Sequence, residues 1–163
     1  MRPASAHTVQ VATASPEVTE ALGRRLGARL RAGDVVALVG PLGSGKTVLA
    51  RGLALGAGAC GYIASPSFVV VREYEAPARI YHIDLYRLER PDEIRDLGLD
   101  DLMDGSGIVI VEWADRAPAL LAEALRIDCA MGPAETERVF TLHIPVVMRG
   151  RLGPAGLGPV VEA

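Results

Sequence analysis

The sequence predicts one α/β domain of three layers, with helices on both faces of a mixed sheet that is mostly parallel at its centre. Two continuous apolar runs, "DVVALVG" at 34–40 and "GIVIVEW" at 107–113, are typical of strands buried in the middle of such a sheet. Segments with helical periodicity alternate with the strand-like runs, and hairpin-like segments add antiparallel pairs. Half of the 163 residues are apolar, which suffices for one core without disulfides.

The chain begins with a predicted strand and an amphipathic helix. The alternating segment "HTVQVAT" at 7–13 predicts the strand. Ser15 followed by Pro16 is typical of a helix start, because serine caps the free N–H groups and proline suits the first helical position. Apolar residues then recur every four positions and predict one buried helix face that Gly33 ends. These residues are Val18, Leu22, Leu26 and Leu30.

A second helix is expected from Gly45 to about Leu55. The segment 65–88 reads as two strands joined at a turn near Ala76-Pro77. Pro91 and the two acids after it predict the first turn of a short helix that ends near Gly98.

The last predicted pair of strands comprises "LRIDCAM" at 125–131 and "ERVFTLHI" at 137–144, joined across Gly132-Pro133. The chain becomes rich in glycine and proline after Pro145. We therefore expect a domain over residues 1–145 and a loosely ordered tail over 146–163.

Composition favours a cytoplasmic protein that binds neither membranes nor free nucleic acid. The net charge is −3 and Lys46 is the only lysine, so no basic stripe is present. No apolar run has the length of a membrane span, and the N-terminus lacks the apolar core of a signal peptide. Cys60 and Cys129 fit no metal-binding spacing, and we expect them to be buried free thiols in a reducing cytosol.

The loop after the first buried strand matches the pattern G-x-x-x-x-G-K-[ST] through Gly40, Gly45, Lys46 and Thr47. Glycines let several backbone N–H groups point at one anion, and the following helix adds the positive end of its dipole. The lysine can reach the β- and γ-phosphates, and the threonine hydroxyl can bind Mg²⁺. The motif thus predicts a P-loop NTPase-type fold that binds a nucleoside triphosphate. The other predicted phosphate-binding positions are Pro41, Leu42, Gly43 and Ser44.

A P-loop also requires an acid at the end of a neighbouring buried strand, and Glu112 follows four apolar residues in "IVIVEW". We predict that Glu112 and Thr47 hold Mg²⁺, in preference to Glu112 being an ordinary solvated carboxylate. Trp113 can either wall the site or serve in packing.

Several classes of protein share this phosphate-binding loop, and other motifs in their sequences distinguish them. A GTPase would carry an Asn-Lys-x-Asp motif, which a chain with a single lysine cannot have, and the serine- and glycine-rich signature of transporter ATPases is missing. A small-molecule kinase would add an arginine-bearing lid. The candidate lid arginines are Arg87, Arg90, Arg95 and Arg116.

Four motifs follow one another along the chain: "GPLGSGKT" at 40–47, "SPSF" at 65–68, "YHIDLYRL" at 81–88 and "EW" at 112–113. This set, in this order, resembles the TsaE (YjeE) family of small bacterial ATPases. The family pattern runs Gly-x-Leu-Gly-x-Gly-Lys-Thr, Ser-Pro-Thr-Phe or Tyr, His-x-Asp-Leu-Tyr-Arg, and Glu-Trp. The resemblance covers roughly residues 8 to 144, and four separated motifs in register make it specific.

The resemblance implies a role in installing threonylcarbamoyl on the adenosine next to the anticodon of tRNAs that read codons beginning with A. In that family a TsaB–TsaD heterodimer performs the transfer, and TsaC supplies threonylcarbamoyl-adenylate. The TsaE protein binds the heterodimer, meets tRNA only through this complex, and hydrolyses ATP poorly when alone.

The resemblance also implies residue roles. Lys46, Asp84 and Glu112 are expected to be catalytic, with Asp84 positioning the attacking water or contacting the metal shell. His82 shares a strand face with Asp84 and is expected to be a partly buried packing residue in preference to a site residue. Ser67, in a segment resembling a γ-phosphate-sensing switch, stands where the family has threonine. We assign no role to Tyr86 or Arg87.

Two other functions remain open at this point. A small-molecule kinase would form ADP only with an added acceptor. A nucleotide-gated binding module would use ATP to set its affinity for a partner and would need no hydrolysis.

Overall fold

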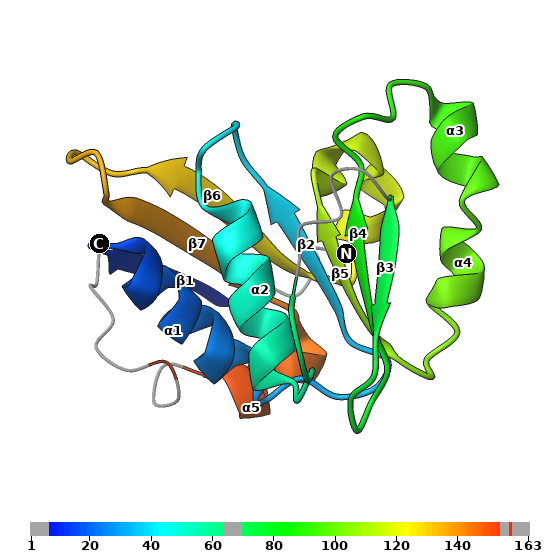
Figure 1. Ribbon diagram of the computed structural model, residues 1–163, viewed down its shortest axis with the longest axis horizontal. Coiled ribbons are helices and arrows are strands. Elements are labelled where there is room, and N and C mark those ends of the chain that lie inside the picture. The colour runs from blue at the N-terminus through cyan, green and yellow to red at the C-terminus, as the bar shows by residue number, and fades with distance from the viewer. Residues whose placement is uncertain (1–6, 64–69, 154–156, 158–163) are drawn as a thin grey trace.

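A computed structural model describes residues 7–63, 70–153 and 157 and contains a seven-stranded mixed sheet (Figure 1). The strands lie in the order β1-β7-β6-β2-β5-β4-β3. The four central strands β6, β2, β5 and β4 are parallel, whereas β1, β7 and β6 pair antiparallel at one edge and β3 pairs antiparallel with β4 at the other. Their bounds are β1 His7–Thr13, β2 Val35–Val39, β3 Val71–Tyr74, β4 Ile80–Asp84, β5 Ile108–Glu112, β6 Leu125–Met131 and β7 Arg138–Ile144.

Helices cover the two faces of the sheet, which confirms the predicted fold class. Figure 1 shows α1 and α2 side by side on one face, where they bury the larger apolar cluster against the sheet. A second cluster on the opposite face joins the central strands to α4 and the short helices after β5. The helical bounds are α1 Pro16–Gly27, α2 Lys46–Gly56, α3 Pro91–Asp96, α4 Leu99–Leu102, η1 Ala114–Arg116, η2 Pro118–Leu121, η3 Val146–Met148 and α5 Arg149–Leu152.

Glycines bring the backbones of α1 and α2 into direct contact. A Cβ on Gly27 would lie 2.1 Å from the Leu53 carbonyl oxygen, and one on Gly52 would lie 2.4 Å from that of Glu20. A Cβ on Gly56 would likewise come within 2.2 Å of the Arg24 carbonyl oxygen. Because no side chain separates the helices at these points, each helix restricts where the other can lie on the sheet.

The first helix is shorter and differently rotated than predicted. It begins as expected with Ser15, whose Oγ accepts a hydrogen bond from the Val18 N–H, but it ends at Gly27 rather than Gly33. Gly33 instead takes a positive φ of 95° in the turn before β2. Val18 is 43% exposed, because the helix turns its glycine-containing side toward α2. Leu22 and Leu26 are buried as predicted.

Both predicted hairpins are confirmed, and the short helix after Pro91 ends at Asp96, two residues before Gly98. Among the described residues both cysteines are free, as expected, but only Cys129 is buried; Cys60 is exposed. No helix in the described ranges is long and apolar enough to cross a membrane.

The residues after Pro145 are more ordered than the composition predicts. Residues 146–152 form η3 and α5, and Met148 and Leu152 are buried in the larger apolar cluster. Arg151 makes two contacts with the Asp34 carboxylate, at 2.6 and 3.0 Å. The guanidinium groups of Arg29 and Arg151 each donate to the backbone carbonyl oxygen of the other residue. These long-range contacts fasten the segment, so for 146–152 the expectation of a loosely ordered tail is wrong.

The glycine contact between the two helices predicts that Gly27→Ala destabilises the protein by about 1–3 kcal/mol, since the new methyl group must displace backbone atoms. The matched control is Gly150→Ala, where a Cβ on a helical glycine would meet nothing within 4 Å. Chemical denaturation of both variants provides the measurement. Equal stabilities for the two would show that α1 and α2 can separate without penalty.

Candidate functional site

The glycine-rich loop joins β2 to α2, the strand and helix that the motif requires. Gly43 and Gly45 adopt φ values of 80° and 92°, which favour glycine. A Cβ on Gly40 would lie 2.2 Å from the Cys129 carbonyl oxygen, so this position has room only for glycine. The loop therefore presents its backbone at the N-terminus of α2, an arrangement suited to binding phosphate.

Lys46 is buried beside the loop. Its Nζ donates to the carbonyl oxygens of Gly40 and Pro41 at 2.7 and 2.6 Å and lies 4.1 Å from the centre of the Trp113 ring. Burial lowers the pKa of Lys46, and nearby carboxylates, including Glu112, partly oppose the shift. Trp113 lines the cavity and covers the lysine, so its ring forms part of the site wall.

Glu112 is 1% exposed, so it is not a solvated carboxylate at a strand end. Its Oε1 accepts a hydrogen bond from Thr47 Oγ1 at 2.7 Å. Its Oε2 lies 2.7 Å from Nε2 of His82, which is also only 1% exposed. The structure thus brings the motif threonine and the predicted acid together, and it gives His82 a polar partner that was not expected of a packing residue.

Asp84 lies next to Glu112, because β4 and β5 are parallel and these residues face each other in register. Its Oδ1 accepts a hydrogen bond from the Tyr86 N–H at 2.9 Å. Burial raises the pKa of Asp84, the Tyr86 hydrogen bond opposes this shift, and the Glu112 charge adds to it. Two carboxylates therefore meet at the carboxyl edge of the sheet, beside the phosphate-binding loop.

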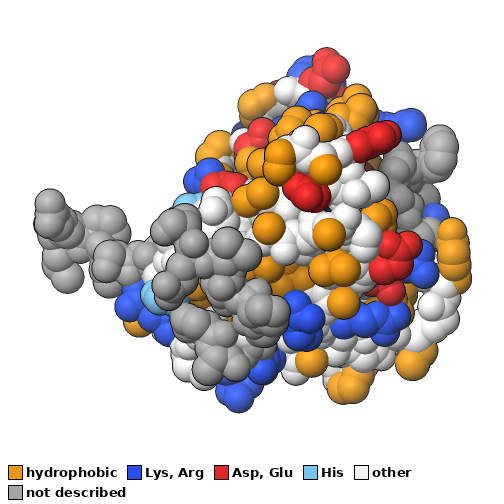
Figure 2. Space-filling view, turned by 90° about the vertical axis from the view of Figure 1, so that its left-hand side faces the viewer, with side chains coloured by type: hydrophobic (Ala, Val, Ile, Leu, Met, Phe, Trp, Pro, Cys, Tyr) orange, Lys and Arg blue, Asp and Glu red, His pale blue; other side chains and the backbone are white. Residues whose placement is uncertain are grey.

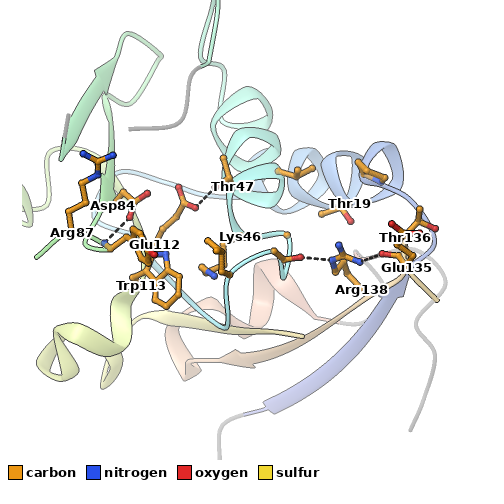
Figure 3. Close-up of a pocket in the computed structure, with 16 residues that line it drawn as sticks. Thr19, Lys46, Thr47, Asp84, Arg87, Glu112, Trp113, Glu135, Thr136 and Arg138 are labelled. Carbon is orange, nitrogen blue, oxygen red and sulfur yellow. Dashed lines mark hydrogen bonds between the residues drawn. The ribbon is translucent and has the colours of Figure 1, made fainter. Parts of the chain in front are cut away.

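These residues line a cavity of about 590 Å³ (Figure 3). Figure 3 shows Asp84, Glu112 and Trp113 on one side of Lys46, and Thr19, Glu135, Thr136 and Arg138 on the other. Arg138 donates from Nε to the Gly43 carbonyl oxygen at 2.9 Å, which joins the β6–β7 hairpin to the loop. This second side was not anticipated, because α1 and the hairpin approach the loop only in the folded chain.

The donor atoms of the site fit a magnesium ion. The part of the chain that the structure describes contains no group of three or more His, Cys, Asp or Glu residues able to hold a metal. Mg²⁺ does not require such a group, because it commonly takes one or two protein ligands and completes its shell with phosphate oxygens and water. A threonine hydroxyl beside the carboxylate of Glu112, at the start of α2, supplies hard oxygen ligands of the right kind.

Three of the four arginines considered for a kinase lid lie outside the cavity and have other partners. Arg116 donates from Nη1 to the backbone carbonyl oxygens of Tyr86 and Leu88 and so fixes the turn after β4. Arg90 and Arg95 form surface ion pairs with Glu93 and Asp92, and Arg87 lines the cavity. Ser67 and the rest of "SPSF" lie outside the described residues.

Comparisons with known proteins agree with the motif pattern. The family model for "Threonylcarbamoyl adenosine biosynthesis protein TsaE" matches residues 13–140. The tRNA threonylcarbamoyladenosine biosynthesis protein TsaE of Bacillus subtilis is 43% identical over 132 residues, covering 79% of this chain and 82% of the relative. The protein of the same name from Streptomyces coelicolor is 44% identical over 124 residues, covering 71% and 82%. The crystal structure of Bacillus subtilis YdiB superposes with a TM-score of 0.71 at 31% identity, covering 84% and 85% of the two chains.

The raised pKa of Asp84 predicts a pH-dependent stability. Between the ordinary aspartate pKa of 3.8 and the raised value, the folded protein binds more protons than the unfolded chain, so stability falls as pH rises through this window. Asp84→Asn removes the titration, and the variant should gain stability over the unaltered protein across the same window. Urea unfolding from acidic to neutral pH measures the difference, and a difference that is constant with pH would contradict the prediction.

The two thiols should differ in reactivity. Burial raises the pKa of Cys129 to about 12, so at about pH 8 only about one molecule in 10⁴ carries this thiolate. Iodoacetamide should label the exposed Cys60 alone in the native protein and both cysteines after unfolding. Cys60→Ser is the control and should abolish native labelling. Rapid native labelling of Cys129 would mean that the segment beside the loop opens readily.

Proposed function

Because the chain belongs to the TsaE family, we propose that it is a cytoplasmic Mg²⁺-dependent ATPase required for threonylcarbamoyl modification of tRNA. The modified base is the adenosine next to the anticodon in tRNAs that read codons beginning with A. The protein acts through a TsaB–TsaD heterodimer and meets tRNA only within that complex. On the face shown in Figure 2, acidic side chains lie mainly on the upper part and basic side chains along the lower part, and the net charge of the chain is −3 with a single lysine. This charge balance fits an indirect role better than independent tRNA binding.

The observation that carries the ATPase proposal is the 2.7 Å hydrogen bond between Thr47 Oγ1 and Glu112 Oε1. It places a hydroxyl and a buried carboxylate together at the start of α2, beside the phosphate-binding loop. A glycine-rich turn without a ligand would not require a buried acid at this point, since taking a carboxylate out of water is costly even when hydrogen bonds partly offset the loss.

Each residue of the site has a role in this proposal. The backbone of residues 40–47 binds the phosphates, and Lys46 leaves its loop carbonyls to contact the β- and γ-phosphate oxygens. Thr47 and Glu112 hold Mg²⁺, which when bound neutralises charge on the phosphates. Asp84, at the same sheet edge, orients the attacking water.

The proposal includes weak ATPase activity of the isolated protein. Phosphoryl transfer depends mainly on charge stabilisation at the γ-phosphate, and an arginine supplied by a partner can contribute about 10³–10⁵ in rate. We therefore propose that docking on the heterodimer completes or reorders the site. The kinase alternative has less support, because Arg116, Arg90 and Arg95 have the other partners described above.

We predict that Mg-ATP hydrolysis by the purified protein is slow and is strongly stimulated by the TsaB–TsaD heterodimer from the same source. Lys46→Ala should abolish the stimulated rate, because it removes the positive charge at the transferred phosphate. Phosphate release, measured with and without the heterodimer, tests both statements. Turnover that appears only when a small-molecule acceptor is added would instead establish the kinase.

Glu112→Gln separates hydrolysis from binding. The variant keeps an oxygen acceptor for Thr47 but loses the negative charge, so it should bind nucleotide and fail to hydrolyse it. If this variant still supported full tRNA modification with the heterodimer, the protein would be a nucleotide-gated binding module rather than an ATPase.

A further inference from the structure

Within the described residues, the side chain of His82 makes one hydrogen bond, and its partner is Glu112. Its Nε2 lies 2.7 Å from Glu112 Oε2, whereas its buried Nδ1 has no hydrogen-bond partner within the described part of the chain. An ionised carboxylate only accepts hydrogen bonds, so Nε2 carries the hydrogen and donates it. His82 is not among the residues that line the cavity, whereas Glu112 is. The hydrogen bond to Glu112 therefore connects the imidazole to the site.

The position of His82 follows from the pairing of β4 and β5. His82 faces Ile110 in register and Asp84 faces Glu112, so the imidazole and the Glu112 carboxylate are diagonal neighbours on one face of the sheet. The side chain of histidine is long enough to span this diagonal. Asp84 lies directly opposite Glu112, at the carboxyl edge of the sheet, and lines the cavity.

The two oxygens of Glu112 are thus used differently. Thr47 binds Oε1 on the loop side, and His82 binds Oε2 from inside the core. Without the imidazole, Oε2 would be a buried acceptor without a protein donor, and the carboxylate could rotate to seek one. A metal-binding carboxylate depends on such hydrogen bonds for its orientation, and loss of the outer partner commonly weakens metal binding by about 10–100-fold.

We propose that His82 is a positioning residue, which orients Glu112 so that its carboxylate can hold Mg²⁺ together with Thr47. This inference rests on the proposed function, since it requires Mg²⁺ with nucleotide at this site. It gives the first residue of "HIDLYR" a role distinct from that of Asp84: His82 acts on the metal through Glu112 and touches neither nucleotide nor water.

Two substitutions separate this role from simple packing. His82→Leu keeps a comparable apolar volume and removes the donor, whereas His82→Gln places an amide N–H near the position of Nε2. Thermal unfolding first establishes that each variant is folded. If His82→Leu does not fold, His82→Asn replaces it, because the shorter amide keeps polarity but does not reach Glu112.

The decisive measurement is the affinity for AMP-PNP, a non-hydrolysable ATP analogue, by calorimetry with Mg²⁺ and again with EDTA. The metal-dependent gain in affinity should fall about 10–100-fold in His82→Leu, while binding in EDTA stays unchanged. His82→Gln should recover most of the gain, which a packing role would not produce.

Each other outcome has a definite meaning. An undiminished metal-dependent gain in His82→Leu would overturn the positioning role. Equal weakening in Mg²⁺ and EDTA, without recovery in His82→Gln, would make His82 a structural residue and leave the proposed ATPase function standing. The unaltered protein is measured first. If its binding of AMP-PNP does not depend on Mg²⁺, the proposed function itself is overturned, whatever the substitutions do.

Discussion

The burial of the Glu112 carboxylate is the constraint on which the site depends. A carboxylate that is 1% exposed needs donors, and the fold provides one from α2 and one from β4. Three elements must therefore meet within hydrogen-bonding distance: β5 carries the acid, β4 the imidazole and α2 the hydroxyl. Because this is possible only when β4 and β5 are parallel and in the observed register, the polar site and the sheet topology constrain each other.

The phosphate-binding loop is held from both of its sides. Behind it, the glycine contacts with α1 fix α2 at backbone distance from its neighbour. At its tip, Arg138 of the β6–β7 hairpin donates to the Gly43 carbonyl oxygen. At the opposite end of β2 from the loop, Arg151 binds Asp34 and fastens the strand that leads into the loop. Glycines allow the backbone of this loop many conformations, and contacts with the neighbouring elements restrict it to one.

The site also combines groups whose charges are unfavourable to bury. Burial lowers the pKa of Lys46 and raises that of Asp84, so both charged forms are disfavoured in the folded protein. Such opposed shifts are common where a protein prepares groups for a charged ligand. A bound polyphosphate would favour the charged lysine, whereas the carboxylates require a cation between themselves and the phosphates. The donor set therefore suits a metal–nucleotide pair better than a free nucleotide.

The parts of this protein that depend on local chemistry could be predicted from its amino-acid pattern. The spacing of Gly40, Gly45, Lys46 and Thr47 predicts a strand, a loop and a helix in order, and the apolar run before Glu112 predicts an acid at the end of a buried strand. Asp84 is identified through the motif resemblance, and the parallel pairing of β4 with β5 sets it beside Glu112. Four features became evident only in the folded chain: the pairing of His82 with Glu112, the approach of Arg138 to Gly43, the exposure of Val18, and the docking of residues 146–152. Each of these depends on strand register or on contacts between residues far apart in the chain, and neither periodicity nor composition carries that information.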